Sequence, residues 1–235
     1  MRPIRPVVLA ILTAALTIGT HPAGSQPKAP TDQTGPLDLV RTSVVRVLAI
    51  VQAPRAAASD GGQRRAEIRR VARGLFDFDE MARLTLARHW KDRSPQEQEE
   101  YVQLFTDLLE RSYLTTIENY SGEKITFLGE SVTGPYAQVR SRITTDRRVE
   151  ISIEYRLIES RARWVVYDVV LDGVSLVSNY RSQFNTIIRT SSFADLLVKL
   201  RSKQIEAHAI PRTSRGLRDG ADAAVAGVIY DLYKK

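Results

Sequence analysis

The chain of 235 residues contains no cysteine. It therefore has no disulfide, no thiolate metal ligand and no cysteine nucleophile, and it lacks the cysteine through which a lipoprotein is anchored. Long hydrophobic runs are also missing. The longest one, Val7 to Ile18, has 12 residues, whereas a helix that spans a bilayer needs about 20. We expect the mature protein to be soluble.

The residues of common catalytic motifs are equally sparse. Of the three histidines, none stands in an HExxH pair or in another metal-binding spacing. There is no nucleophile elbow, no Walker loop and no glycine-rich dinucleotide motif. His89, beside Trp90, is interpreted as a packed or capping residue, and Asp77 and Asp79 as helix caps. The sequence predicts no catalytic residue, no metal and no cofactor.

The N-terminus has the order of a secretory signal peptide. Arg2 and Arg5 precede the short apolar run, and the small residues Ala23, Gly24 and Ser25 follow it. This pattern predicts export and cleavage after Ser25. The alternative is a membrane anchor, for which the apolar run is short. We therefore assign residues 1–25 to a signal peptide.

The charge is moderately basic. Lysine and arginine number 34 against 27 acids, a net charge of +7 that becomes +5 without Arg2 and Arg5. Basic residues alternate with acids along the chain, which argues against a nucleic-acid partner. A mild positive charge favours approach to anionic membranes or acidic partners. A solvated basic surface without any partner explains it equally well.

The hydrophobic periodicity changes twice along the chain. Helical spacing occupies 37–51, 63–73 and 95–120, where Ser94 and Glu97 form a capping box. Alternation typical of strands follows in 124–130, 136–145, 148–158 and 164–171. Helical patterns return at 176–188 and 192–201. This segregated order predicts an α+β fold with helices packed on a curved, four-stranded antiparallel sheet. We expect a flexible leader at 26–36, one domain at 37–204 and a weakly patterned basic tail at 205–235.

Several segments resemble the MlaC family, the periplasmic components of phospholipid-transport ABC systems, also called toluene-tolerance proteins. The segments are FDFDEMARLTLARHW (76–90), SPQEQEEYVQLFTDLLERSYLTTIENYSGEKI (94–125), ISIEYRL (151–157) and WVVYDVVLDGVSLVSNYRSQFNTII (164–188). The resemblance covers Leu37 to Leu200. Where the family has Ala-Leu-Gly, this chain has Thr85-Leu86-Ala87, and we expect the alanine to straighten that turn. The chain also runs beyond the usual family end.

The resemblance implies a cone-shaped, NTF2-like fold whose cavity holds a glycerophospholipid. It further implies a non-enzymatic shuttle in the periplasm between the outer and inner membranes. The implied partners are an inner-membrane ABC transporter with an MCE-domain component and an outer-membrane lipoprotein complex. ATP would be hydrolysed by the transporter alone.

The candidate cavity wall comes from the apolar faces of the strands, the long helix and the ends of the elements. Either face of the fourth strand can point inward, and the pattern alone favours a packed core. The wall candidates are Leu75, Phe76, Leu104, Leu108, Leu109, Val139, Ile151, Ile153, Tyr155, Val166, Val170, Val174 and Leu176.

Two rival functions stay open. A small hydrolase or dehydratase on a similar cone-shaped α+β fold would need an acid or base in the cavity, and only Tyr155 and an inward-facing Asp168 are available. An interaction module with a filled core would bind no lipid at all.

Export is directly testable. Protein isolated from a bacterial periplasm should begin near Gln26, as read by mass spectrometry, because cleavage is expected after Ser25. A protein that starts at Met1 and stays in the membrane fraction would contradict the signal-peptide assignment.

Overall fold

A computed structural model describes residues 34–54, 60–145 and 148–205. These residues all belong to one compact unit. The expected signal peptide at 1–25 lies outside the described residues, as do nearly all of the leader at 26–36 and of the tail at 205–235.

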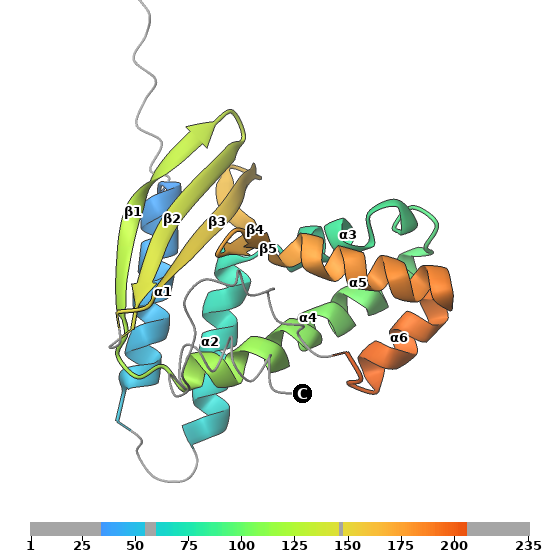
Figure 1. Cartoon of the computed structure of the whole chain (residues 1–235), viewed down its shortest axis with the longest axis horizontal. Coiled ribbons are helices and arrows are strands. Elements are labelled where there is room, and N and C mark those ends of the chain that lie inside the picture. The colour runs from blue at the N-terminus through green and yellow to red at the C-terminus, as the bar shows by residue number, and fades with distance from the viewer. Residues whose placement is uncertain (1–33, 55–59, 146–147, 206–235) are drawn as a thin grey trace, which may run out of the picture. The chain divides into compact units, whose positions relative to one another are not determined.

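The described residues form an α+β fold, as predicted (Figure 1). Four α-helices and one 3-10 turn come first, a sheet follows, and two helices close the order. The helices are α1 (Pro36–Gln52), α2 (Asp60–Leu75), α3 (Phe78–Leu86), a 3-10 turn (Ala87–His89), α4 (Pro95–Glu118), α5 (Leu176–Thr190) and α6 (Phe193–Arg201). The strands are β1 (Lys124–Thr133), β2 (Tyr136–Thr144), β3 (Glu150–Ser160), β4 (Arg163–Leu171) and β5 (Val174–Ser175).

The sheet is an antiparallel meander in the order β1-β2-β3-β4-β5. It has five strands, so the expected number of four was wrong. The extra strand is β5, in which Val174 pairs with Leu171 across a tight turn at Asp172 and Gly173. A strand of two residues has no alternation to read, so the sequence pattern gave no signal for it.

Two irregularities interrupt the ladders. On β1 the register shifts between Phe127 and Gly129, and Gly129 has a φ of 123°. On β3 and β4 the register shifts at Arg156 and Leu157, so that one strand carries an extra residue. Bulges of this kind bend the strand and increase its twist, and they account for the curvature that was expected.

The hydrophobic side chains divide into two clusters rather than one. The helical core comprises Met81, Ala82, Leu86, Tyr101, Phe105, Leu108, Leu109, Val177, Tyr180, Phe184, Phe193, Leu196, Leu197, Leu200 and Ile205. The sheet core comprises Val40, Leu75, Ala137, Val139, Leu157 and Val166. In Figure 1, α1 and α2 lie beside the sheet, while α3, α5 and α6 gather at the opposite end of α4.

The predicted caps are present. Asp77 accepts a hydrogen bond from the backbone N–H of Glu80, 2.9 Å away, and so begins α3. Ser94 and Glu97 form the expected capping box of α4, and these bonds lower the pKa of the Glu97 carboxyl. Ser192 begins α6 through the N–H of Asp195. Each cap satisfies a backbone donor that the helix leaves free.

A buried carboxylate joins the sheet to α5. Asp168 on β4 accepts hydrogen bonds from the Ser175 hydroxyl at 2.6 Å, the Val177 N–H at 3.0 Å and the Arg156 guanidinium at 3.3 Å. It therefore satisfies the first turn of α5 and fixes that helix against β4. A second link lies at the start of α3, where the N–H of Asp77 donates to the carbonyl of Val166.

The turn after α3 departs from the expectation. Ala87 has φ 49° and ψ −115°, so the turn is kept and not straightened. A side chain is strained in this conformation because its Cβ crowds the backbone, whereas glycine adopts it freely. Glycine suits this position because it adopts a positive φ without strain. This chain forms the same turn with alanine, at a cost in conformational free energy.

Replacing Ala87 with glycine should therefore stabilise the protein. We expect the free energy of unfolding to rise by about 1 kcal/mol, because the strain at positive φ is removed. Urea denaturation measures the change. The control is Ala66→Gly in the exposed interior of α2, which should lower stability by about 1 kcal/mol. A loss of stability in Ala87→Gly would contradict the assignment of strain.

Candidate functional site

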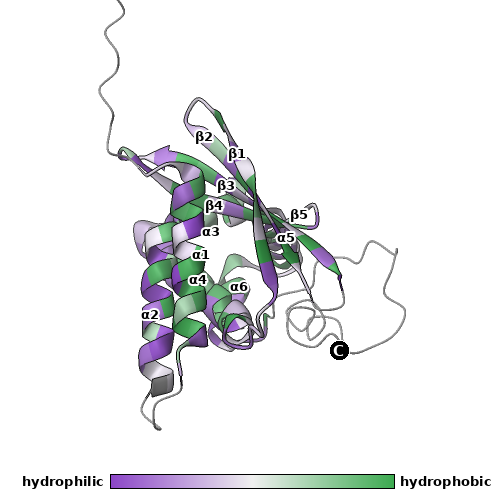
Figure 2. Ribbon diagram, turned by 90° about the vertical axis from the view of Figure 1, so that its left-hand side faces the viewer, coloured by the Kyte–Doolittle hydropathy of each residue, from purple (hydrophilic) through white to green (hydrophobic). Residues whose placement is uncertain are grey.

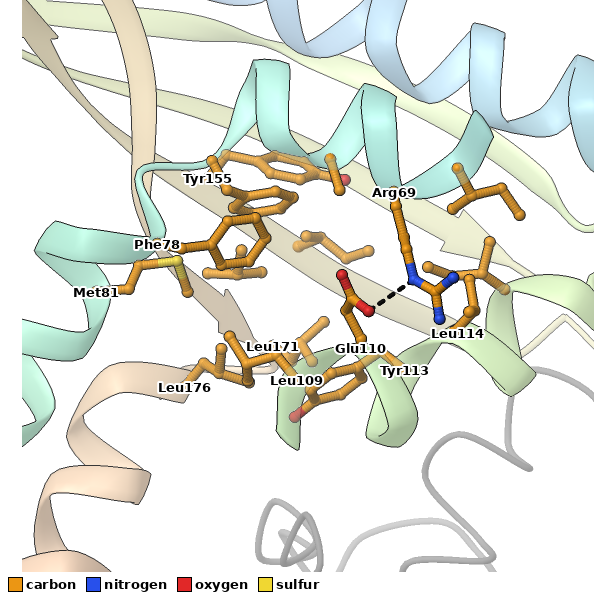
Figure 3. Close-up of a pocket in the computed structure, with 16 residues that line it drawn as sticks. Arg69, Phe78, Met81, Leu109, Glu110, Tyr113, Leu114, Tyr155, Leu171 and Leu176 are labelled. Carbon is orange, nitrogen blue, oxygen red and sulfur yellow. Dashed lines mark hydrogen bonds and ion pairs between the residues drawn. The ribbon is translucent and has the colours of Figure 1, made fainter. Parts of the chain in front are cut away.

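An apolar cavity with two lobes lies between the sheet and helices α2 and α4. The first lobe has a volume of about 240 Å³ and the second about 320 Å³. Figure 3 shows the first lobe, with Phe78, Met81, Leu171 and Leu176 at one end and Leu114 at the other. The lobes are adjacent because they share the lining residues Ile68, Ala72, Phe76, Tyr113, Ile117, Ile153, Tyr155 and Leu171.

Each lobe adds its own wall to this shared set. The first extends toward α3 and α5 through Arg69, Phe78, Met81, Leu109, Glu110, Leu114, Val169 and Leu176. The second extends toward α1 and the far strands through Ser43, Val44, Val47, Leu48, Val71, Leu75, Thr116, Tyr120, Ile125, Ile143 and Ile151.

The structure brings part of the predicted wall together at this cavity. The candidates that line it are Leu75, Phe76, Leu109, Ile151, Ile153, Tyr155 and Leu176. The other candidates lie elsewhere: Leu104, Leu108, Val139, Val166, Val170 and Val174. For the candidates on α4 and β4, two separate physical causes explain the difference.

Helix α4 changes its environment along its length. Leu108 is fully buried in the helical core, and Leu104 packs against the same core. The cavity wall begins at the next residue, Leu109, and continues along Tyr113 and Ile117. One apolar stripe on one helix thus serves both a packed core and a cavity wall, and the sequence does not mark the point where one becomes the other.

The alternation of side chains along strand β4 reverses at its bulge, so the residues on the cavity side of the sheet change from even to odd numbers. Directly opposite residues of an antiparallel pair lie on the same face, and Ile153 and Tyr155 pair with Leu171 and Val169. Val169 and Leu171 therefore line the cavity, while Val170 points to the opposite face. Before the bulge, Val166 pairs with Leu157, and both are buried in the sheet core.

Helices α1 and α2 supply wall residues that the sequence reasoning missed. Figure 2 shows the two helices side by side, each with hydrophobic and hydrophilic residues. On α2, Ile68, Val71, Ala72 and Leu75 recur at helical spacing. This stripe is readable in the sequence, but it is narrow and stands among many charged residues.

Ion pairs connect α2 to α4 beside the cavity. The Arg69 Nε atom lies 2.6 Å from Glu110 Oε2, as Figure 3 shows, and Arg65 makes a two-bonded pair with Glu118. Arg73 lies 4.0 Å from the other Glu110 oxygen. Arg69 and Glu110 line the first lobe, so their mutual pairing places a neutral unit at its edge.

Two tyrosines of the wall are held neutral. Burial raises the pKa of Tyr155, and burial raises the pKa of Tyr113 well above its usual value. Asp168 lies on the other face of β4, where its three hydrogen bonds hold it, so it does not enter the cavity. His89 contacts Asn185 and lines neither lobe. The cavity wall is therefore apolar with neutral hydroxyls.

Over the described part of the chain, no cluster of His, Cys, Asp or Glu is arranged to hold a metal ion. Within the same residues, no helix combines the length and the apolar character needed to cross a bilayer.

The family model for the MlaC protein matches residues 41–202. The chain belongs to the MlaC family. A relative from Haemophilus influenzae, the intermembrane phospholipid transport system binding protein MlaC, is 22% identical over 174 residues, which cover 72% of this chain and 81% of that protein. Among solved structures, the phospholipid-binding protein from Ralstonia solanacearum, in complex with a phospholipid, aligns with a TM-score of 0.64. That alignment is 22% identical and covers 71% of this chain and 95% of the other, which shows that the two share the MlaC fold.

The buried wall tyrosine predicts a pH dependence. An unfolded tyrosine loses its proton near pH 10, whereas folded Tyr155 keeps it because burial raises its pKa. The native state then binds more protons, so stability falls as the pH rises past about 10. Tyr155→Phe should remove part of this loss of stability.

Urea denaturation between pH 8 and pH 11 measures the effect on wild type and variant. Tyr136→Phe is the control, since Tyr136 is exposed in the folded protein. Equal slopes in wild type and Tyr155→Phe would show that this hydroxyl is not buried in solution.

Proposed function

We propose that this protein is a periplasmic carrier that holds a glycerophospholipid by its acyl chains and moves it between the outer and inner membranes. The observation that carries the proposal is the two-lobed apolar cavity between the sheet, α2 and α4, in a chain of the MlaC family. A relative named for intermembrane phospholipid transport and a neighbour of the same fold solved with a phospholipid support the same ligand class.

The energy scale suits a carrier. Burying one methylene contributes about 0.8 kcal/mol, so two acyl chains could supply more than the practical limit of about 18–21 kcal/mol for non-covalent binding. Even a part of that free energy makes release into water slow. Transfer then requires docking at a donor or acceptor site, where the chains pass between apolar surfaces.

We propose no catalytic step. The residues that line the two lobes include neither a histidine nor a serine–base pair, and the one charged pair there, Arg69 with Glu110, is internally neutralised. A hydrolase or dehydratase would need a free acid or base facing the ligand. The expected docking partners are an inner-membrane ABC transporter with an MCE-domain component and an outer-membrane lipoprotein complex.

One isoleucine and one valine of the sheet, Ile153 and Val166, give a matched test. Ile153 lines both lobes, whereas Val166 is fully buried in the sheet core. A carboxylate in a packed core costs several kcal/mol, so Val166→Glu should unfold the protein. In Ile153→Glu, water that replaces the lipid can solvate the new charge, so the variant should fold and lose its lipid.

Thermal unfolding and native mass spectrometry of protein purified from a bacterial periplasm measure both outcomes. Ile153→Val is the control and should retain wild-type lipid. Wild-type protein without any bound lipid would contradict the carrier function. A folded Ile153→Glu that keeps its full lipid would instead show that this face of the sheet is not the binding site.

A further inference from the structure

A polar pocket adjoins the first apolar lobe. Its volume is about 770 Å³, and it lies between the end of α2, the start of α3, the first half of α4 and the β3–β4 turn. Phe76, Phe78 and Glu110 line both the polar pocket and the apolar lobe. An amphiphile with its chains in the lobe can therefore place its polar end in this adjacent pocket.

The lining of the polar pocket carries charges of both signs. The cations are Arg73, Arg83, Arg161 and Arg163, and the acids are Asp77, Asp79, Glu80, Asp107 and Glu110. Asp107 and Glu110 pair with Arg111 and Arg69, which lie outside this lining, so four positive charges remain against three acids. A slightly positive lining of this kind can hold a ligand that carries a phosphate group.

Most of these charges already have partners. Arg83 makes two bonds to Glu80, Asp77 caps α3, Asp107 pairs with Arg111, and Glu110 pairs with Arg69. Their donors and acceptors are largely satisfied, so they contribute little to a ligand.

The remaining groups are free to bind. Within the described part of the chain, the side chains of Arg161, Arg163 and Asp79 form no ion pair or hydrogen bond, and the Arg73 side chain only approaches Glu110 at 4.0 Å. Three available guanidinium groups and one available carboxylate thus lie around one pocket, next to the opening of an apolar cavity.

We propose that this polar pocket binds the headgroup of the phospholipid, with its phosphodiester on Arg73 and Arg163. The inference rests on the proposed function, because it assumes that the acyl chains occupy the apolar cavity. Guanidinium groups bind phosphate oxygens through charge-assisted hydrogen bonds.

The β3–β4 turn presents the arginines of this pocket. Arg161 and Ala162 occupy the turn with φ of 49° and 60°, and Arg163 begins β4 directly after it. Two successive left-handed residues make a tight hairpin turn that keeps the strands paired up to Ser160 and Arg163. The turn therefore holds Arg161 and Arg163 at the end of the β3–β4 hairpin, where both line the pocket.

Three lipids with the same two oleoyl chains test the proposal. They are phosphatidylethanolamine, which is zwitterionic, phosphatidylglycerol, which is anionic, and diacylglycerol, which has no phosphate. The delipidated full chain should bind both phospholipids about tenfold more tightly than diacylglycerol. In the Arg73→Gln/Arg163→Gln variant, phosphatidylethanolamine should bind about tenfold more weakly, while diacylglycerol binding stays unchanged.

Competition measured by native mass spectrometry gives the relative affinities. Arg70→Gln is the matched control, because Arg70 is an exposed arginine on α2 that lines none of the three pockets. Diacylglycerol binding as tight as phospholipid binding in the wild-type protein, or a preference for phospholipid that survives in the double variant, would overturn the headgroup site. Binding of none of the three lipids would instead contradict the carrier function itself.

Discussion

The buried carboxylate of Asp168 is the constraint on which the arrangement of sheet and helices depends. It satisfies the first turn of α5 and the side chains of Ser175 and Arg156 at once, so β4, β5 and α5 meet in one fixed geometry. Helix α5 in turn packs Val177, Tyr180 and Phe184 into the helical core. Asp168 therefore holds β4, β5 and α5 together and takes no part in the cavity, because it lies on the opposite face of β4.

The cavity persists because its walls are supported from elsewhere. Helices α3, α5 and α6 enclose the first half of α4, and α1 covers the sheet core. Both clusters border the space between α2, the second half of α4 and the sheet, through Met81, Leu109 and Leu75, but neither fills it, and the apolar lobes lie there. Ion pairs between α2 and α4 add a connection across this space without filling it. A carrier needs this division, since a single continuous core would leave no room for acyl chains.

Sequence reasoning predicted the elements well and the cavity in part. The capping box at Ser94 and the alternation of β3 were readable because local chemistry determines them. The inward face of β4 was not, because one extra residue at the bulge exchanges the faces of Val169 and Val170. Periodicity also cannot separate a packed residue such as Leu108 from a wall residue such as Leu109, since both are apolar and differ only in what lies opposite. That difference is a property of the tertiary arrangement.

The division of α4 into a packed half and a cavity-facing half gives one continuous helix two local stabilities. Around Tyr101 and Phe105 the backbone opens only when the helical core opens, so its amide protons should exchange slowly with solvent. Past Glu110 one face of the helix lines the apolar space, so local opening there breaks fewer packing contacts than around Phe105. The second half of α4 can therefore open locally to admit a bulky acyl chain while the first half stays folded. Loading and unloading of the lipid then require no global unfolding of the protein.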